Sequence, residues 1–120
     1  MKKWEILYYK DQDGNCPVEK FIDSRSEKNQ AKIMAFLSLL EERGPELPRP
    51  YADLLRDGIH ELRVKLSGDQ VRILYFFVHQ SNIILTHAFT KNTSKVPKAE
   101  IKRALQIKEE YIKRFSKRGE

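Results

Sequence analysis

The stretch that most constrains the fold is residues 61–95, in which hydrophobic β-type residues are divided by two short turn signals. The first signal is Ser67-Gly68-Asp69, and the second is Gln80-Ser81-Asn82. Three strands joined by such short polar turns predict a small antiparallel sheet. Polar and aliphatic residues alternate along the first strand, so Arg63 and Lys65 should lie on the same face of that sheet.

Basic or titratable side chains recur along this sheet, at Arg63, Lys65, Arg72, His87 and Lys91. The chain has 23 Lys and Arg against 17 Asp and Glu, which gives a formal charge of +6. Residues 1–58 hold ten basic and eleven acidic side chains, whereas residues 59–120 hold thirteen and six. A positive half of this kind predicts a polyanion partner, with a well-solvated basic surface as the alternative.

The flanking residues predict one further strand and three helices. Residues 4–9 are aromatic and β-branched, Pro17 favours the start of a helix, and residues 26–43 show helical spacing of apolar side chains. Residues 51–58 are interpreted as a short turn or helix, and a last helix should begin near Pro97. The order β-α-α-β-β-β-α predicts a single α+β domain over residues 1–120, with helices packed on one face of the antiparallel sheet.

The composition also limits the possible chemistry and location. The single Cys16 excludes an internal disulfide, and the three scattered His residues show no metal-ligand spacing, so neither a metal site nor another cofactor is expected. The N-terminus becomes charged too early for a signal peptide, and no apolar run approaches the ~20 residues of a membrane span. We therefore expect a cytoplasmic protein.

Four short motifs in order give the chain a family resemblance. They are ELR at 61–63, VRILY at 71–75, HAFTK at 87–91 and PKAEI at 97–101, with Ala104 after the last. In these motifs the chain resembles the RelE superfamily of bacterial type II toxins and, within it, the phage-derived HigB-like branch. The resemblance implies a RelE-like toxin fold and an mRNA interferase that cuts messenger RNA in the ribosomal A site. It also implies a small helix-turn-helix antitoxin of the HigA type as partner.

Metal-free RNA cleavage needs a base for the 2′-hydroxyl, cations for the phosphorane charge and an acid for the leaving 5′-oxygen. Guanidinium groups offer forked donors to phosphate, a histidine exchanges protons near neutrality, and a lysine among cations can have a depressed pKa. The predicted catalytic residues are Arg63, Arg72, His87 and Lys91. The predicted RNA-binding residues are Lys65, Phe89 and Lys95.

Each of these assignments has a structural alternative. The arginines could form surface pairs with Glu61 or Asp69, and the lysines could simply be solvated. His87 could be a satisfied, half-buried residue, because it shares strand parity with Ile83 and Leu85. Phe89 could belong to the core.

Two departures from the family pattern leave the acid and base unassigned. Many relatives carry two adjacent lysines after the last strand, whereas here Asn92 follows Lys91. The late tyrosine that some relatives use has one counterpart, Tyr111, which falls on the apolar stripe of the last helix.

Two alternative functions stay open: a ParE-like poison of DNA gyrase, and an inactive module that binds antitoxin or RNA. The helix at 26–43 or an exposed sheet edge could receive the antitoxin.

Overall fold

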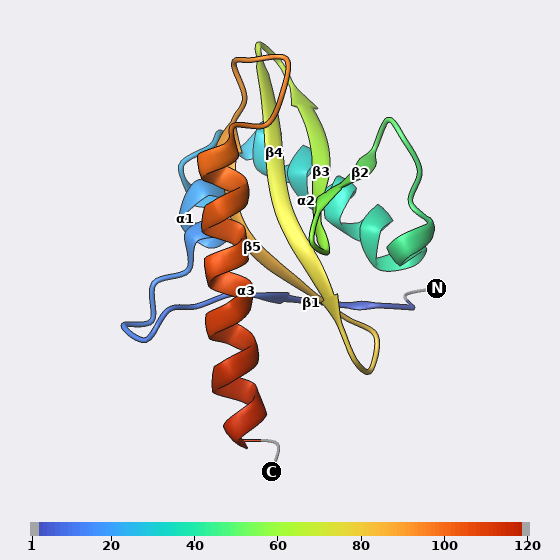
Figure 1. Cartoon of the computed structure of the whole chain (residues 1–120). Helices are drawn as coiled ribbons and strands as arrows, with labels where there is room; N and C mark the ends of the chain where they lie inside the picture. The colour runs from blue at the N-terminus through green and yellow to red at the C-terminus, as the bar shows by residue number, and fades with distance from the viewer. Residues whose placement is uncertain (1–2, 119–120) are drawn as a thin grey trace.

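The computed structural model describes residues 3–118 and contains one five-stranded sheet with the strand order β1-β5-β4-β3-β2 (Figure 1). The strands are β1 (Glu5–Tyr8), β2 (Ala52–Arg56), β3 (Ile59–Leu66), β4 (Asp69–Val78) and β5 (Asn82–Thr90). Strands β2 to β5 pair antiparallel in succession, which confirms the three-stranded core of the prediction. Strand β1 pairs parallel with β5, so the sheet is mixed rather than purely antiparallel.

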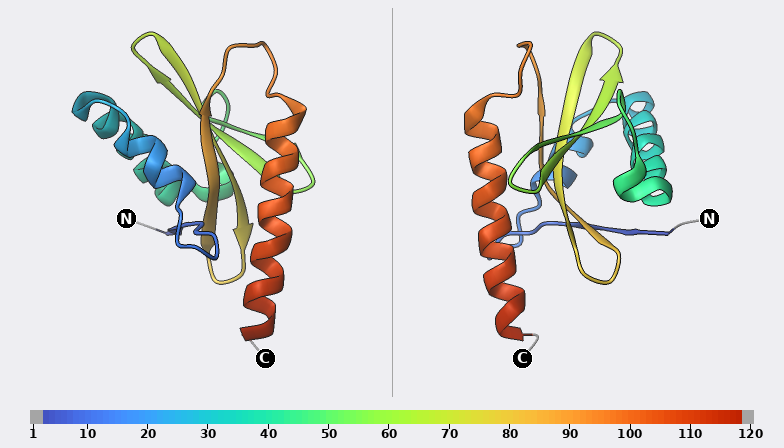
Figure 2. Two further views of the ribbon diagram at one scale, coloured as in Figure 1. Left: turned by 90° about the vertical axis from the view of Figure 1, so that its left-hand side faces the viewer. Right: turned by 45° about the vertical axis from the view of Figure 1, so that its right-hand side comes forward.

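The helices are α1 (Pro17–Asp23), α2 (Glu27–Arg43) and α3 (Lys98–Arg118), and a short 3₁₀ turn follows α2 at Gly44–Glu46. The α+β class is confirmed, but the prediction that all helices pack on one face is wrong. Helices α1 and α2 cover one face of the sheet and α3 covers the other (Figure 2). None of the helices within residues 3–118 is long and apolar enough to cross a membrane.

Two-sided packing follows from the central strand β4, which is buried almost from end to end. Ile73 and Tyr75 belong to the core under α1 and α2, whereas Leu74 and Phe76 belong to the core under α3. A strand covered on both faces carries a continuous apolar run instead of a clean alternation. The run from 73 to 78, ILYFFV, therefore required a helix on each face.

Strand β2 occupies part of the segment that was expected to be a turn or short helix, so that prediction is wrong. Asp57 and Gly58 connect β2 to β3 with φ angles of 50° and 82°. Two successive residues with positive φ match the twist of a two-residue hairpin, and Asp-Gly is among the strongest sequence signals for it. This dipeptide could have revealed the strand.

A register shift in the β4–β5 ladder changes the direction of the side chains in β5. Leu74 pairs with His87, but Tyr75 pairs with Leu85, which leaves Thr86 as an extra residue. The Thr86 hydroxyl lies 3.1 Å from the Leu74 carbonyl oxygen, to which it can donate. Such a bulge reverses the alternation, so His87 lies on the α3 face while Leu85 lies in the opposite core. The prediction that His87 shares a face with Leu85 is wrong for this reason.

Candidate anion-binding site

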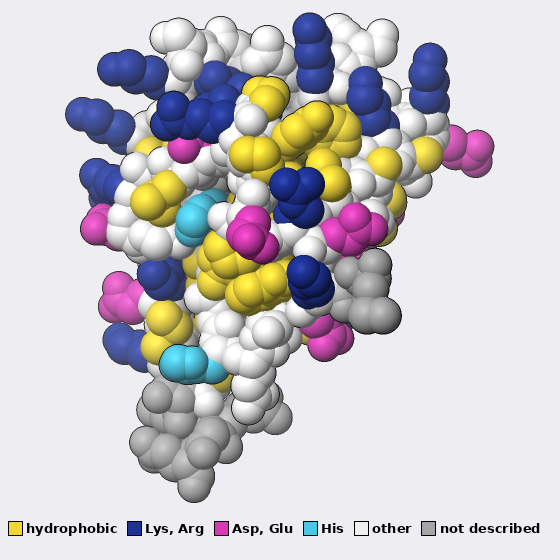
Figure 3. Space-filling model, turned by 90° about the vertical axis from the view of Figure 1, so that its right-hand side faces the viewer, with side chains coloured by type: hydrophobic (Ala, Val, Ile, Leu, Met, Phe, Trp, Pro, Cys, Tyr) yellow, Lys and Arg dark blue, Asp and Glu magenta, His cyan; other side chains and the backbone are white. Residues whose placement is uncertain are grey.

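All of the predicted site residues except Lys95 come together on the face of the sheet on which α3 packs. Cross-strand pairing sets them in three neighbouring rows on this face: Asp53, Glu61, Leu74 and His87; Arg63, Arg72 and Phe89; Lys65, Gln70 and Lys91. Lysine and arginine side chains crowd the upper part of the molecule, the end at which β3 joins β4 and α3 begins (Figure 3). Lys95 is exposed in the loop between β5 and α3 and is not part of the rows.

The buried carboxylate of Glu61 holds the two arginines together. Its Oε2 accepts from Arg63 Nε at 3.1 Å and from Arg63 Nη2 at 3.0 Å. Its Oε1 lies 3.0 Å from Arg72 Nε, a charge contact without the alignment of a hydrogen bond. The exposed fractions of the Glu61 and Arg72 side chains are 4% and 8%. Both arginines therefore pair with Glu61, as the structural alternative predicted. The shared carboxylate is buried, however, and the pairs are not surface pairs.

The remaining contacts of Arg72 fix its guanidinium in place. Nη1 donates to the Val71 carbonyl at 3.1 Å, and Nη2 donates to Gln70 Oε1 at 3.4 Å. Burial lowers the pKa of Arg72, but a guanidinium starts so high that it stays charged in proteins. Asp69, the other proposed partner, lies 3.7 Å from Arg25 instead.

Asp53, on the edge strand β2, is a member of the site that sequence reasoning missed. Its Oδ2 lies 3.3 Å from Arg63 Nη2 and 3.1 Å from Arg49 Nη2. Hydrogen bonds from Arg49 hold the pKa of the Asp53 carboxyl below its usual range. Because β2 was not predicted, no sequence pattern placed Asp53 beside Arg63.

Lys91 lies just beyond the end of β5, where its backbone N–H donates to the Gln70 carbonyl at 2.7 Å. Partial loss of hydration lowers the pKa of the Lys91 ammonium, and the positive charges of Arg72 and Arg63 lower it further. The ammonium is therefore easier to deprotonate than that of an isolated lysine. This environment agrees with the predicted role of a lysine among cations.

His87 is the most deeply buried of the predicted site residues, with 1% of its side chain exposed. Its Nε2 lies 3.0 Å from Glu100 Oε1 on α3, and its Nδ1 lies 3.1 Å from Thr86 Oγ1. Burial lowers the pKa of the imidazole, although the Glu100 contact opposes this shift. The neutral tautomer with the proton on Nε2 donates to Glu100, and its Nδ1 shares the single proton of the Thr86 hydroxyl with the Leu74 carbonyl. His87 thus matches the satisfied-histidine alternative and is more buried than that alternative assumed.

The two aromatic candidates differ in their surroundings. Phe89 is partly exposed and stacks on the His87 ring, with centroids 5.6 Å apart. Tyr111 packs edge-to-face against Phe76 at 5.8 Å and stacks on Phe115 at 4.3 Å, within the core under α3. Phe89 can therefore offer an aromatic surface beside the arginines, whereas Tyr111 lies away from them.

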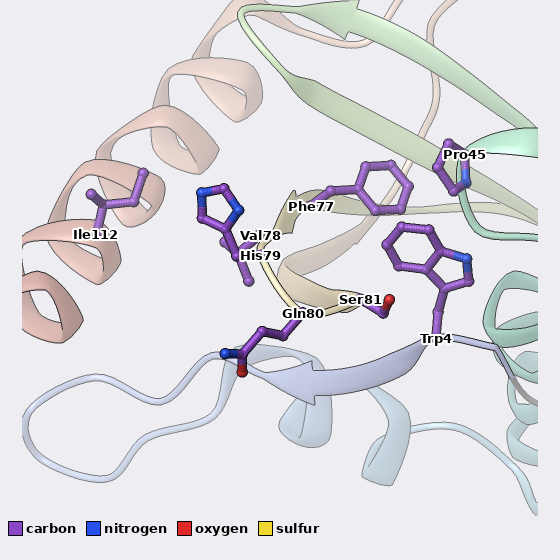
Figure 4. Close-up of a pocket in the computed structure, with 8 residues that line it drawn as sticks. All are labelled: Trp4, Pro45, Phe77, Val78, His79, Gln80, Ser81 and Ile112. Carbon is purple, nitrogen blue, oxygen red and sulfur yellow. The ribbon is translucent and has the colours of Figure 1, made fainter. Parts of the chain in front are cut away.

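A hollow of about 690 Å³ lies at the opposite end of the sheet, beside the β4–β5 turn. Trp4 and Phe77 lie on one side of it and Ile112 of α3 on the other (Figure 4). Its lining residues within the described part of the chain include no lysine or arginine. None of these described lining residues offers the positive charge that an RNA phosphate needs. Within residues 3–118 no three side chains of His, Cys, Asp or Glu are grouped to hold a metal ion.

A protein-family model matches most of the chain. The family model described as "Phage derived protein Gp49-like (DUF891)" matches residues 20–109, which include all of the predicted site residues as well as Asp53 and Glu61. No curated protein matches the chain.

Proposed function

This chain belongs to the Gp49-like family of phage-derived proteins, and from that membership we propose that it is the toxin of a type II toxin–antitoxin system. We assign it to the HigB-like branch of the RelE superfamily, on the motifs described above. Its proposed activity is metal-independent cleavage of messenger RNA on the ribosome. The observation that carries this proposal is the Arg63–Arg72 pair on neighbouring strands, anchored on buried Glu61, in which the Arg63 side chain is 32% exposed and the Arg72 side chain 8% exposed.

The arginine pair suits the charge that develops during RNA cleavage. The 2′-oxygen bonds to the adjacent phosphorus, the bond from phosphorus to the 5′-oxygen breaks, and the phosphorane between these events carries extra negative charge. Two guanidinium groups on neighbouring strands can donate to its non-bridging oxygens at the same time. Because Glu61 fixes both groups in advance, little reorganisation is needed when the charge forms.

Lys91 is the proposed acceptor of the 2′-hydroxyl proton. Its lowered pKa increases the fraction of neutral amine near pH 7, which is the form that can take a proton. The resulting ammonium stands beside the phosphorane and can return the proton to the leaving 5′-oxygen. Lys65 and Lys95 extend the positive surface for the flanking phosphates, and Phe89 offers a face on which a base can stack.

We assign His87 a positioning role rather than direct contact with RNA, because its ring is buried. The ring joins the bulge at Thr86 to Glu100 on α3 and supports the ring of Phe89. It thereby fixes the start of α3, which packs on the same face of the sheet.

The proposed partner is a helix-turn-helix antitoxin, and the proposed compartment is the cytoplasm. The outer edge of β2 is a suitable docking surface, because β2 pairs only with β3 and exposes Leu54. The solvent face of α2, which exposes Met34, is the other surface that the sequence suggested.

The test is inducible expression in bacteria of the wild type beside Arg72→Ala, with growth followed and transcript 5′ ends mapped. We expect growth arrest with new 5′ ends inside translated messages, both lost in Arg72→Ala. Arg56→Ala is the matched control, because Arg56 lies on β2 and pairs with neighbouring Asp57 rather than with the site. Arrest without new ends would refute cleavage and favour a gyrase poison. No arrest from a folded product would favour an inactive binding module.

A further inference from the structure

We propose that Asp53 is an internal counter-ion that competes with the RNA phosphate for Arg63 and thereby limits the affinity of the site for RNA. The inference rests on the proposed function and adds to it a residue that determines affinity. The four sequence motifs do not include Asp53, and its ion pairs are with Arg49 and Arg63 rather than with Arg72.

The geometry places Asp53 at Nη2, one of the two terminal nitrogens through which Arg63 can bind a phosphate. Nη2 of Arg63 donates one hydrogen bond to buried Glu61. The same atom donates a second to Asp53 Oδ2, at 3.3 Å. A phosphate oxygen approaching this end of the guanidinium meets a carboxylate that accepts the same hydrogen bond. A phosphate that binds both terminal nitrogens of Arg63 must therefore displace Asp53 or approach it closely as a second anion.

Asp53 is easier to displace than Glu61. The Asp53 side chain is 22% exposed, whereas that of Glu61 is 4% exposed. Water screens and can replace the contact of the exposed carboxylate, but it cannot reach the buried one. Asp53 also lies on an edge strand whose register against β3 shifts between Leu54 and Arg56. Glu61 thus acts as the permanent partner of Arg63 and Asp53 as the exchangeable one.

Arg49 modulates this competition because it binds the same oxygen. Its Nη2 lies 3.1 Å from Asp53 Oδ2, closer than the Arg63 contact, and its side chain is 75% exposed. Arg49 therefore draws part of the Asp53 charge away from Arg63. Loss of Arg49 should strengthen the hold of Asp53 on Arg63.

The first test compares RNA affinity in Asp53→Asn and wild type, with a single-stranded oligoribonucleotide carrying 2′-O-methyl groups so that it is not cleaved. We expect the affinity to rise about three- to tenfold at low salt. The slope of log affinity against log salt should steepen by about 0.7, the value for one further phosphate contact on a single strand. Glu109→Gln is the control, because it changes the net charge equally at an exposed pair with Lys113.

A second pair of variants leaves Asp53 in place. Arg49→Gln and Arg56→Gln each remove one exposed cation near β2, but only Arg49 touches Asp53. We expect Arg49→Gln to weaken RNA binding more than Arg56→Gln does. In the Asp53→Asn background the two substitutions should have equal effects, because the shared carboxylate is gone.

A gain in affinity by a variant that a thermal melt shows to be folded is informative in its sign. The inference is overturned if folded Asp53→Asn binds no better than Glu109→Gln while Arg63→Ala still weakens the wild-type interaction. If neither Arg63→Ala nor Arg72→Ala changes RNA binding, the proposed site itself fails, and the inference fails with it. Higher affinity in Asp53→Asn supports the inference even for a protein that does not cut RNA.

Discussion

The Oε1 atom of Glu61 lies 3.0 Å from Nε of Arg72, and both side chains are almost completely buried. Neither of these two atoms has a hydrogen-bond partner among residues 3–118, so each depends on the charge of the other, while Glu61 also pairs with Arg63 through Oε2. Removing one member of a buried pair leaves an uncompensated charge, whereas removing an exposed partner leaves a charge that water can solvate. The two carboxylates beside Arg63 should therefore differ sharply in what they contribute to stability.

We expect Glu61→Gln to lower the free energy of unfolding by about 3–5 kcal/mol, the usual cost of breaking a buried ion pair. Asp53→Asn should lower it by less than about 1 kcal/mol, because its pairs with Arg49 and Arg63 are partly solvated. Urea denaturation of both variants measures the difference. If both variants lost the same free energy of unfolding, Glu61 would not be a permanent partner of Arg63 and Asp53 an exchangeable one.

Arg63→Ala should reduce mRNA cleavage by about 10²–10³-fold, by analogy with the loss of one donor to a developing oxyanion. The guanidinium is partly exposed, so its removal should affect catalysis more than folding. Cleavage of a ribosome-bound message by the purified variant measures the effect, and a thermal melt checks that the variant is folded. A folded variant with wild-type cleavage would remove Arg63 from the mechanism.

The rate of cleavage should rise with pH through the pKa of Lys91, which lies below its ordinary value of 10.5. The direction follows because only the neutral amine accepts the 2′-hydroxyl proton. Lys91→Arg keeps the positive charge but loses this titration, so the variant should be slow and its rate should not rise over the same range. The pH–rate profiles of the two proteins provide the measurement, and parallel profiles would exclude Lys91 as the base.

Stability should fall as the pH drops below about 6.5, because of His87. Burial lowers the pKa of His87 in the folded state below 6.5, so between these two pKa values the unfolded chain binds a proton that the folded protein does not. The stabilisation is complete above the unfolded pKa and declines by at most about 1.4 kcal/mol per pH unit below it. Glu100 opposes the shift and Arg103 reinforces it, and both lie on α3.

The matched variant for this test is His87→Gln, which has no titrating group at the position. Urea unfolding between pH 7.5 and 5.5 should give a flatter dependence for His87→Gln than for the wild type. The variant should be less stable at every pH, because Thr86 and Glu100 lose their shared partner. If both proteins lose stability in parallel, another group is responsible.

Local sequence patterns determined most of the secondary structure. Pro17 is the first residue of α1, α2 ends at Arg43 before Gly44, and both turns that bound β4 lie where the polar signals placed them. These features depend on backbone preferences within a few residues, which a sequence shows directly. Alternation also brought Arg63 and Lys65 to one face of β3, as expected.

Only the tertiary structure decided how these elements combine into a site. Thr86 is an extra residue in the β4–β5 ladder, and that one residue moves His87 from the α1–α2 side to the α3 side. The partners of the site residues are also remote in sequence: Asp53 is ten residues from Arg63, and Glu100 is thirteen from His87. Periodicity fixes how side chains alternate within a strand, but strand register and the packing of α3 fix which faces meet. The sequence by itself therefore named the cations of the candidate site and offered Glu61 as a partner of the arginines, whereas the fold buried Glu61 between them and brought Asp53 beside Arg63.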